Sequence, residues 1–80
     1  MRLPRDINGT TLVKGLKVYG YNVTRQAGSH IRLTTHQKGE HHITIPNHTP
    51  IKIGTLSAIL QDIALHFGIE KDEVINKIFG

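Results

Sequence analysis

Cysteine and tryptophan are absent from this sequence of 80 residues, which contains only two phenylalanines and two tyrosines. The absence of cysteine excludes disulfide bridges and thiolate metal sites, so the fold must depend on an aliphatic core. No apolar run approaches the roughly 20 residues of a membrane helix, and the N-terminus lacks the apolar region of a signal peptide. We therefore expect one domain over residues 1–80, with no membrane partner and a cytoplasmic location.

Acidic residues are also few, with 6 Asp and Glu against 10 Lys and Arg, and the formal net charge is +4 at pH 7. This excess indicates an anionic partner such as a nucleic acid, although many small proteins are basic without binding one. A chain of this length buries only about 60% of its unfolded surface, which leaves little room for a deep pocket. A shallow, open site suits a polymeric substrate better than an enclosed metabolite.

The N-terminal part of the chain is expected to form an amphipathic helix. Asn8 is a suitable N-cap, and Gly20 is a typical stop signal. Between them the apolar side chains recur at helical spacing, at Leu12, Val13, Leu16 and Tyr19. The interior Gly15 costs about 1 kcal/mol relative to alanine, so this helix must depend on tertiary packing or allow a close approach there.

A change to a period of two then predicts three strands. The first covers residues 21–26, with Tyr21 and Val23 on one face and Asn22 and Thr24 on the other. Residues 27–29 form a short hairpin turn, in which Gly28 can adopt a positive φ. The second strand covers about residues 30–36, and the third follows a turn at residues 37–40 and ends at Pro46. The buried positions on these two strands are Ile31, Leu33, Ile43 and Ile45.

The C-terminal part of the chain is expected to be helical after an extended loop at residues 46–53. The second helix is predicted to start at Gly54, with Thr55 as its N-cap, and to stop at Gly68. Its apolar stripe consists of Leu56, Ile59, Leu60, Ile63 and Phe67. A short last helix is expected over about residues 72–78, where the acidic start agrees with the helix dipole.

The order of these elements predicts an α+β domain of two layers. A three-stranded antiparallel meander between two amphipathic helices should pack both helices on one face, in an α-β-β-β-α arrangement with a short extra helix. This resembles the fold of double-stranded-RNA-binding domains, a topology that unrelated functions share. The other face of the sheet is then polar and open, with His30, Arg32, Thr34, His42 and Thr44 on it.

Five of the six histidines lie between residues 30 and 48, a density that makes metal binding one candidate function. Zinc needs three or four ligands that converge at about 2.0–2.1 Å for nitrogen. His30 and His36 are separated by roughly 20 Å along a strand, so they cannot share one ion. We expect no native metal and no cofactor. Ser29 and His30 point to opposite faces, so they do not by themselves form a nucleophile and its base.

Cleavage of RNA by internal attack fits the residues better. The RNA 2′-hydroxyl attacks its own phosphate, so the protein needs only to move protons and stabilise negative charge, and histidine changes charge near neutral pH. The turn at Gly28 and Ser29 and the start of the second helix near Thr55 offer backbone N–H groups to a phosphate. Four cations are expected near His30, each of which has an ordinary solvated charge as its alternative: Arg25, Arg32, Lys38 and Lys52.

Three stretches, GYNVTRQAGSHIRL, ITIPNH and KIGTLSAIL, resemble the HicA (YcfA-like) toxin family in that order and at the expected separations, over roughly residues 8–68. The resemblance implies a small RNA-binding-like fold, ribosome-independent cleavage of mRNA, and neutralisation by a HicB-type antitoxin. It also implies that His30 is catalytic and that Gly28 and Ser29 form the turn that presents it. Arg25, Pro46 and His48 match other recurrent positions of the family.

The sequence departs from the family pattern in two places. Family members often continue the G-S-H with further histidines, whereas Ile31 and Arg32 follow here, and the extension after Gly68 is longer than in the shortest members. His48 has two interpretations, as a group that approaches the substrate or His30 and as a loop histidine that is hydrogen-bonded to the backbone.

The resulting hypothesis is a metal-independent endoribonuclease, an mRNA interferase, in which His30 transfers protons. The residues expected to bind RNA or support the site are Arg25, Gly28, Ser29, Arg32, Lys38, His48, Lys52 and Thr55. One alternative is a non-catalytic RNA-binding module or degenerate toxin. Another is a domain whose basic face binds an acidic protein.

Overall fold

The computed structural model describes residues 3–80. The elements in chain order are α1 (Gly9–Leu16), the 3-10 helix η1 (Lys17–Tyr19), β1 (Asn22–Ala27), β2 (His30–Thr35), β3 (His41–Pro46), α2 (Ile53–Phe67) and α3 (Lys71–Phe79). The strands form one antiparallel sheet in the order β1-β2-β3. The α+β fold predicted from the sequence is therefore confirmed.

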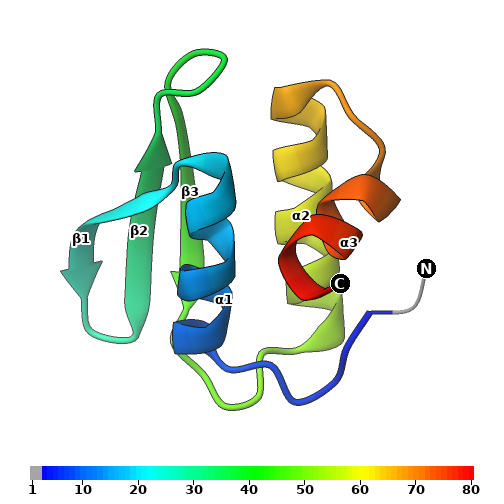
Figure 1. The fold of residues 1–80 in the computed structure, drawn as a ribbon. Helices are drawn as coiled ribbons and strands as arrows, with labels where there is room; N and C mark the ends of the chain where they lie inside the picture. The colour runs from blue at the N-terminus through cyan, green and yellow to red at the C-terminus, as the bar shows by residue number, and fades with distance from the viewer. Residues whose placement is uncertain (1–2) are drawn as a thin grey trace.

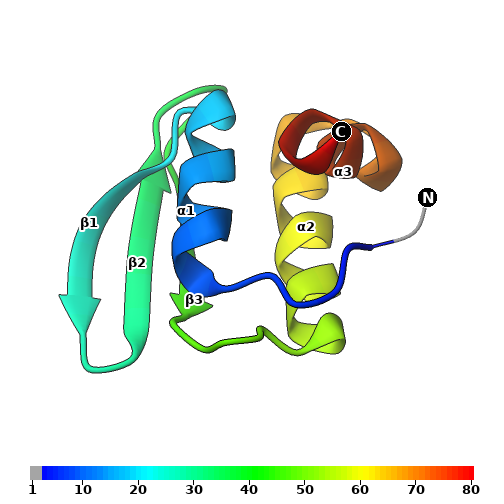
Figure 2. The same ribbon diagram turned by 60° about the horizontal axis from the view of Figure 1, so that its bottom comes forward.

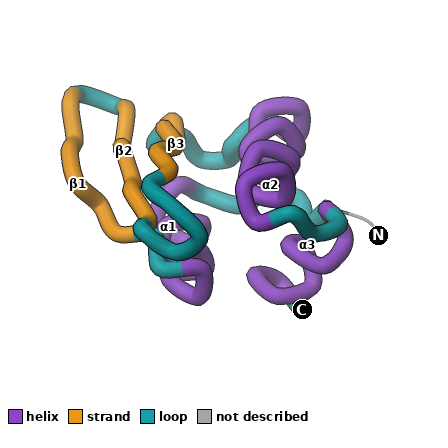
Figure 3. Tube along the Cα trace, turned by 90° about the horizontal axis from the view of Figure 1, so that it is seen from above, coloured by secondary structure: helices purple, strands orange, loops and turns teal. Residues whose placement is uncertain are grey.

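The sheet and the helices form separate layers. Helices α1 and α2 both lie on one side of the sheet, as Figures 1 and 3 show, and α3 packs against them. Strand β1 is the strand furthest from the α2–α3 layer (Figure 2), and all six of its residues are exposed. The face of the sheet that points away from the helices is not covered by any described element. In residues 3–80, no helix combines the length and hydropathy needed to span a membrane.

An aliphatic core holds the two layers together. The inner face of the sheet contributes Ile31, Leu33, Ile43 and Ile45, each of which is less than 9% exposed. They pack with buried side chains from all three helices. Full burial of one such side chain is worth about 1.5–3 kcal/mol, so these alternating residues fix which face of the sheet carries the helices.

Most predicted helix signals are confirmed, with one correction. The Asn8 side chain accepts a hydrogen bond from the backbone N–H of Thr11 at 2.8 Å, and Gly68 ends α2 with φ +66°. The expectation that Thr55 is the N-cap of α2 is wrong, because α2 already begins at Ile53 and Lys52 is the N-cap residue. Lys52 has an extended backbone and makes no side-chain capping bond, so the first turn forms without the usual polar cap.

The strands differ from simple alternation at two points. A register shift, or β-bulge, lies between Val23 and Arg25, so the predicted alternation is correct only for the first residues of β1. Thr34 lies on the open face as predicted but is only 7% exposed. It is covered because its hydroxyl group hydrogen-bonds to the Thr24 hydroxyl at 3.0 Å and to Nδ1 of His42 at 2.7 Å.

Candidate functional site

His30 stands at the exposed start of β2, directly after the two-residue turn Gly28-Ser29. Gly28 adopts φ +57°, in the left-handed region that side chains other than glycine rarely occupy, so glycine permits this tight turn. In the sheet, His30 is flanked by Ala27 on β1 and Pro46 on β3. Its imidazole is therefore presented at the end of the sheet, open to solvent.

The loop after β3 is hydrogen-bonded to this turn. The backbone N–H of Asn47 donates to the carbonyl oxygen of Ser29 at 2.5 Å, and the N–H of Ile51 donates to the carbonyl oxygen of Ile7 at 2.8 Å. The Ile51 side chain is 3% exposed and anchors the loop in the core. Because Asn47 lies next to His48, these bonds bring the histidine of the loop to the same end of the molecule as His30.

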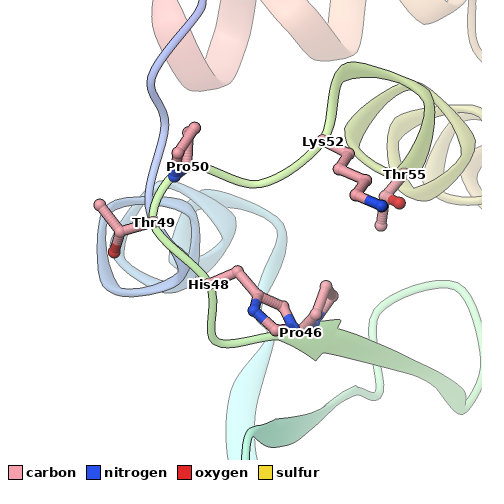
Figure 4. A pocket seen from close by; sticks show the side chains of 6 residues that line it. All are labelled: Pro46, His48, Thr49, Pro50, Lys52 and Thr55. Carbon is pink, nitrogen blue, oxygen red and sulfur yellow. The ribbon is translucent and has the colours of Figure 1, made fainter.

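A shallow pocket of about 400 Å³ opens beside this loop (Figure 4). Its lining residues are Pro46, His48, Thr49, Pro50, Lys52 and Thr55. Pro46, which forms part of the pocket wall, is paired with His30 in the sheet, so the pocket lies next to the strand pair that contains His30. Lys52 and Thr55 come from the start of α2, where no acidic residue lies in the first turn. The pocket therefore combines a lysine ammonium group, a histidine and a helix start that favours negative charge.

Arg25 and Arg32 lie on the open face of the sheet, two residues along the strands from the pair formed by Ala27 and His30. They are direct partners across β1 and β2, and both are exposed. Three ion pairs near the sheet each join a histidine to a carboxylate: His36–Glu40, His41–Asp62 and His42–Glu40. Within residues 3–80, neither arginine is neutralised by a carboxylate, so the His30 end of the sheet carries uncompensated positive charge.

The structure places Lys38 away from the other candidates. Lys38 lies in the turn between β2 and β3, at the opposite end of β2 from His30 (Figure 1). A strand rises about 3.3 Å per residue, so the length of β2 separates this lysine from the pocket. Seven of the predicted positions are gathered within the turn, the β1–β2 rows and the pocket: Arg25, Gly28, Ser29, Arg32, His48, Lys52 and Thr55.

A polar network at the Lys38 end was missed by sequence reasoning. The Tyr21 hydroxyl group lies 2.7 Å from Nδ1 of His41, whose Nε2 lies 3.4 Å from Oδ1 of Asp62. His66 stacks on His41 with ring centroids 4.4 Å apart and hydrogen-bonds to the carbonyl oxygen of Gln37. The only sequence signal was the parity that puts His41 on the inner face of its strand. The network joins β3 to α2 at the end remote from His30.

Burial governs the ionisation of both tyrosines. It raises the pKa of Tyr21, and the carboxylate of Asp62 adds to the effect. Burial also raises the pKa of Tyr19, with a contribution from Glu73. The Asp62 carboxylate can only accept, so in the neutral ring of His41 the N–H lies on Nε2, facing Asp62, and Nδ1 accepts from the Tyr21 hydroxyl group. In residues 3–80, no group of three or more His, Cys, Asp or Glu side chains is arranged to hold a metal ion.

Comparison with protein-family models identifies the family of the chain. The family model described as the HicA toxin of bacterial toxin-antitoxin systems matches residues 9–65. The chain belongs to the HicA toxin family. Searches of curated proteins and of solved structures gave no match, so the likeness to double-stranded-RNA-binding domains has no structural neighbour to support it. The HicA match includes the turn with His30, the loop with His48 and the start of α2, so it covers the whole assembled end of the molecule.

Proposed function

We propose that this HicA-family chain is an endoribonuclease that cleaves mRNA and that His30 is the group that moves protons in the reaction. The observation that carries this proposal is the position of His30, which is exposed, lies at the end of the sheet and is the strand partner of Pro46, a residue that lines the pocket with Lys52 and His48. Membership of a toxin family of toxin-antitoxin systems, whose members generally act on RNA, supports the same reaction class.

The chemistry follows from the groups present. The imidazole of His30 accepts the proton of the 2′-hydroxyl while its oxygen attacks the adjacent phosphorus. The bond from phosphorus to the 5′ oxygen breaks, and the departing 5′ oxygen takes a proton from solvent water. The Lys52 ammonium group and the first N–H groups of α2 stabilise the charge that develops on the phosphate oxygens. His48 lies on the same pocket wall and donates a hydrogen bond to the phosphate. The nucleophile belongs to the substrate, so this route requires no metal ion.

A cognate HicB-type antitoxin is the proposed protein partner. Toxin-antitoxin pairing is implied by the family, and the exposed end with His30 is the surface that an inhibitor must cover to stop the reaction. The positive charge of Arg25, Arg32 and Lys52 on this end is complementary to an acidic antitoxin segment.

The proposal is tested by substituting His30→Ala and measuring RNA cleavage and RNA affinity with the purified protein. Loss of the proton-transfer group should lower the cleavage rate by about 10²–10⁴-fold, while affinity changes by no more than a few fold. His36→Ala is the matched control, because His36 is an exposed histidine directly after the end of β2 that is remote from His30. Cleavage by His30→Ala at the wild-type rate would reject the assignment. A wild-type protein that binds RNA without cutting it would establish the RNA-binding alternative.

A further inference from the structure

The β-bulge in β1 determines where Arg25 points. Before the bulge, Val23 pairs with Leu33; after it, Arg25 pairs with Arg32. With regular pairing, Thr24 would lie opposite Arg32, and Arg25 would share the inner face with Ile31. The extra residue instead turns Arg25 to the open face of the sheet. Bulges are typical devices for re-aiming a side chain close to a functional site.

The bulge is held in place by the side chain of its extra residue. The Thr24 hydroxyl group hydrogen-bonds to the Thr34 hydroxyl at 3.0 Å and lies 3.4 Å from the carbonyl oxygen of Arg32. Thr34 is in turn bonded to Nδ1 of His42. These side-chain bonds on the open face therefore hold the bulge directly before Arg25.

The pairing of Arg25 with Arg32 is electrostatically unfavourable for the isolated fold. Two like charges directly opposite each other on adjacent strands destabilise a sheet. No carboxylate among the described residues is paired with either side chain. Arginines at paired positions can both direct their guanidinium N–H donors to the oxygens of one phosphate, which would remove the repulsion.

The distance from this pair to His30 suggests which phosphate it binds. The row formed by Arg25 and Arg32 lies two residues along the strands from the row formed by Ala27, His30 and Pro46. Two residues of a strand span about 7 Å, which is close to the separation of successive phosphates along a single RNA strand.

We propose that Arg25 and Arg32 together bind one phosphate of the RNA, the neighbour of the phosphate that reacts at His30. The RNA strand then runs along β2 over the open face of the sheet and ends at the pocket between the loop after β3 and α2. This inference rests on the proposed function, because it uses His30 to define the reacting phosphate. It assigns the β-bulge a role in substrate placement.

Salt dependence of binding provides the first test, and it uses the cleavage-deficient His30→Ala protein so that the result does not depend on catalysis. The affinity for a short single-stranded RNA is measured over a range of salt concentrations for Arg25→Gln, Arg32→Gln and the double variant. If both arginines share one phosphate, the double variant should make the negative slope of log K against log salt less steep by about 0.7, which is the effect of one lost phosphate contact. The losses of binding free energy in the two single variants should then be strongly non-additive. A fall of about 1.4, with additive single variants, would overturn the shared site.

Neutral linkages in the RNA provide the second test. In a substrate with one cleavage site, each flanking phosphodiester is replaced in turn by an uncharged methylphosphonate. For the protein with both arginines, replacement of one of the two phosphodiesters that flank the cleaved linkage should reduce kcat/KM by about 10-fold. The double arginine variant should lose that sensitivity alone. An equal loss at every linkage, or no loss, would contradict the proposal even if His30 proves catalytic.

Two controls distinguish a specific phosphate site from a general effect of positive charge and from a structural role of the two arginines. Lys77→Gln removes an exposed positive charge on α3 and should leave the pattern of sensitive linkages unchanged. Arg25→Gln should not lower the melting temperature, because it removes a repulsion. A lower melting temperature would indicate a structural role for the pair. Unchanged RNA binding with weakened binding of the antitoxin would assign the pair to the protein interface and overturn the proposal.

Discussion

Two buried tyrosines near the start of the sheet have different hydrogen-bonding environments. Tyr21 is fully buried, and its hydroxyl group donates to His41. Tyr19 is 8% exposed, and its hydroxyl oxygen is the buried side-chain polar atom without a hydrogen-bond partner in the described part of the chain. Both rings pack against Phe67, with centroids 4.9 Å away for Tyr19 and 6.2 Å for Tyr21. The hydroxyl groups therefore distinguish two otherwise similar aromatic residues.

Removing the two hydroxyl groups should have opposite effects on stability. Tyr21→Phe should lower the free energy of unfolding by about 1–2 kcal/mol, because it deletes a hydrogen bond and leaves Nδ1 of His41 without its donor. Tyr19→Phe should be neutral or stabilising by up to about 1 kcal/mol, because an unpaired buried hydroxyl group is removed. Denaturant unfolding of the two variants measures both effects. Equal destabilisation by the two substitutions would show that the network does not distinguish them.

The raised pKa of Tyr21 adds a dependence on alkaline pH. Its pKa is higher in the folded chain than the ordinary value of 10.0, so the stability linked to its proton is fully present below pH 10 and decreases as the pH rises above it. Tyr21→Phe should flatten this decrease in unfolding experiments between pH 9 and 11. The sequence placed Tyr21 on one strand face with Val23. Its partner His41 was not identified, because no sequence pattern links positions that are 20 residues apart.

At the scale of elements, the contact between α1 and α3 explains why a glycine, which is unfavourable inside a helix, occupies the interior of α1. Gly15 lies in the interior of α1, and a Cβ atom placed there would lie 2.6 Å from Cγ2 of Ile78 on α3. The sequence indicated a close approach or tertiary packing at Gly15, and the structure identifies the partner. The sequence alone does not identify Ile78 as this partner, because helix pairing depends on the arrangement of the whole core.

Gly15→Ala should therefore destabilise the fold although alanine is the better helix former. Overpacking against Ile78 should cost about 1–2 kcal/mol net of the helix propensity gained. In an Ile78→Ala background, the same substitution should become stabilising by up to about 1 kcal/mol. A double-mutant cycle of thermal unfolding measures this reversal. If Gly15→Ala stabilises the chain that still has Ile78, the close contact does not constrain the packing of α3.

Strand and helix boundaries show which local features the sequence can predict. The apolar alternation of Ile31, Leu33, Ile43 and Ile45 correctly predicted the buried face, because burial of several side chains fixes the register. The bulge at Thr24 could not be predicted, because it depends on a side-chain bond to Thr34 across the sheet. Thr55 was predicted as a cap from its residue type, whereas Lys52 can occupy that position with an extended backbone and no capping bond.

At the scale of the whole molecule, the two ends of the sheet differ in charge. One end carries His30, His48 and Lys52, with the arginine row beside it. At the other, histidines are paired with Glu40 and Asp62. Most of the candidate site was predictable from the GSH and PNH segments, because the antiparallel hairpins bring them together. Lys38 was grouped with them because of its charge, although the predicted turn at residues 37–40 follows the end of the strand that His30 begins.

The chemistry of the cleaved ends tests the central claim most directly. Purified protein is incubated with an RNA of defined sequence in the presence of a chelator, and the product ends are identified by mass spectrometry. Internal attack predicts a 2′,3′-cyclic phosphate and a 5′-hydroxyl group, and a single 2′-deoxy nucleotide at the cleavage site should abolish cutting there. Products with a 3′-hydroxyl group and a 5′-phosphate, formed equally well at the 2′-deoxy position, would contradict attack by the RNA's own 2′-hydroxyl with His30 as the group that accepts its proton.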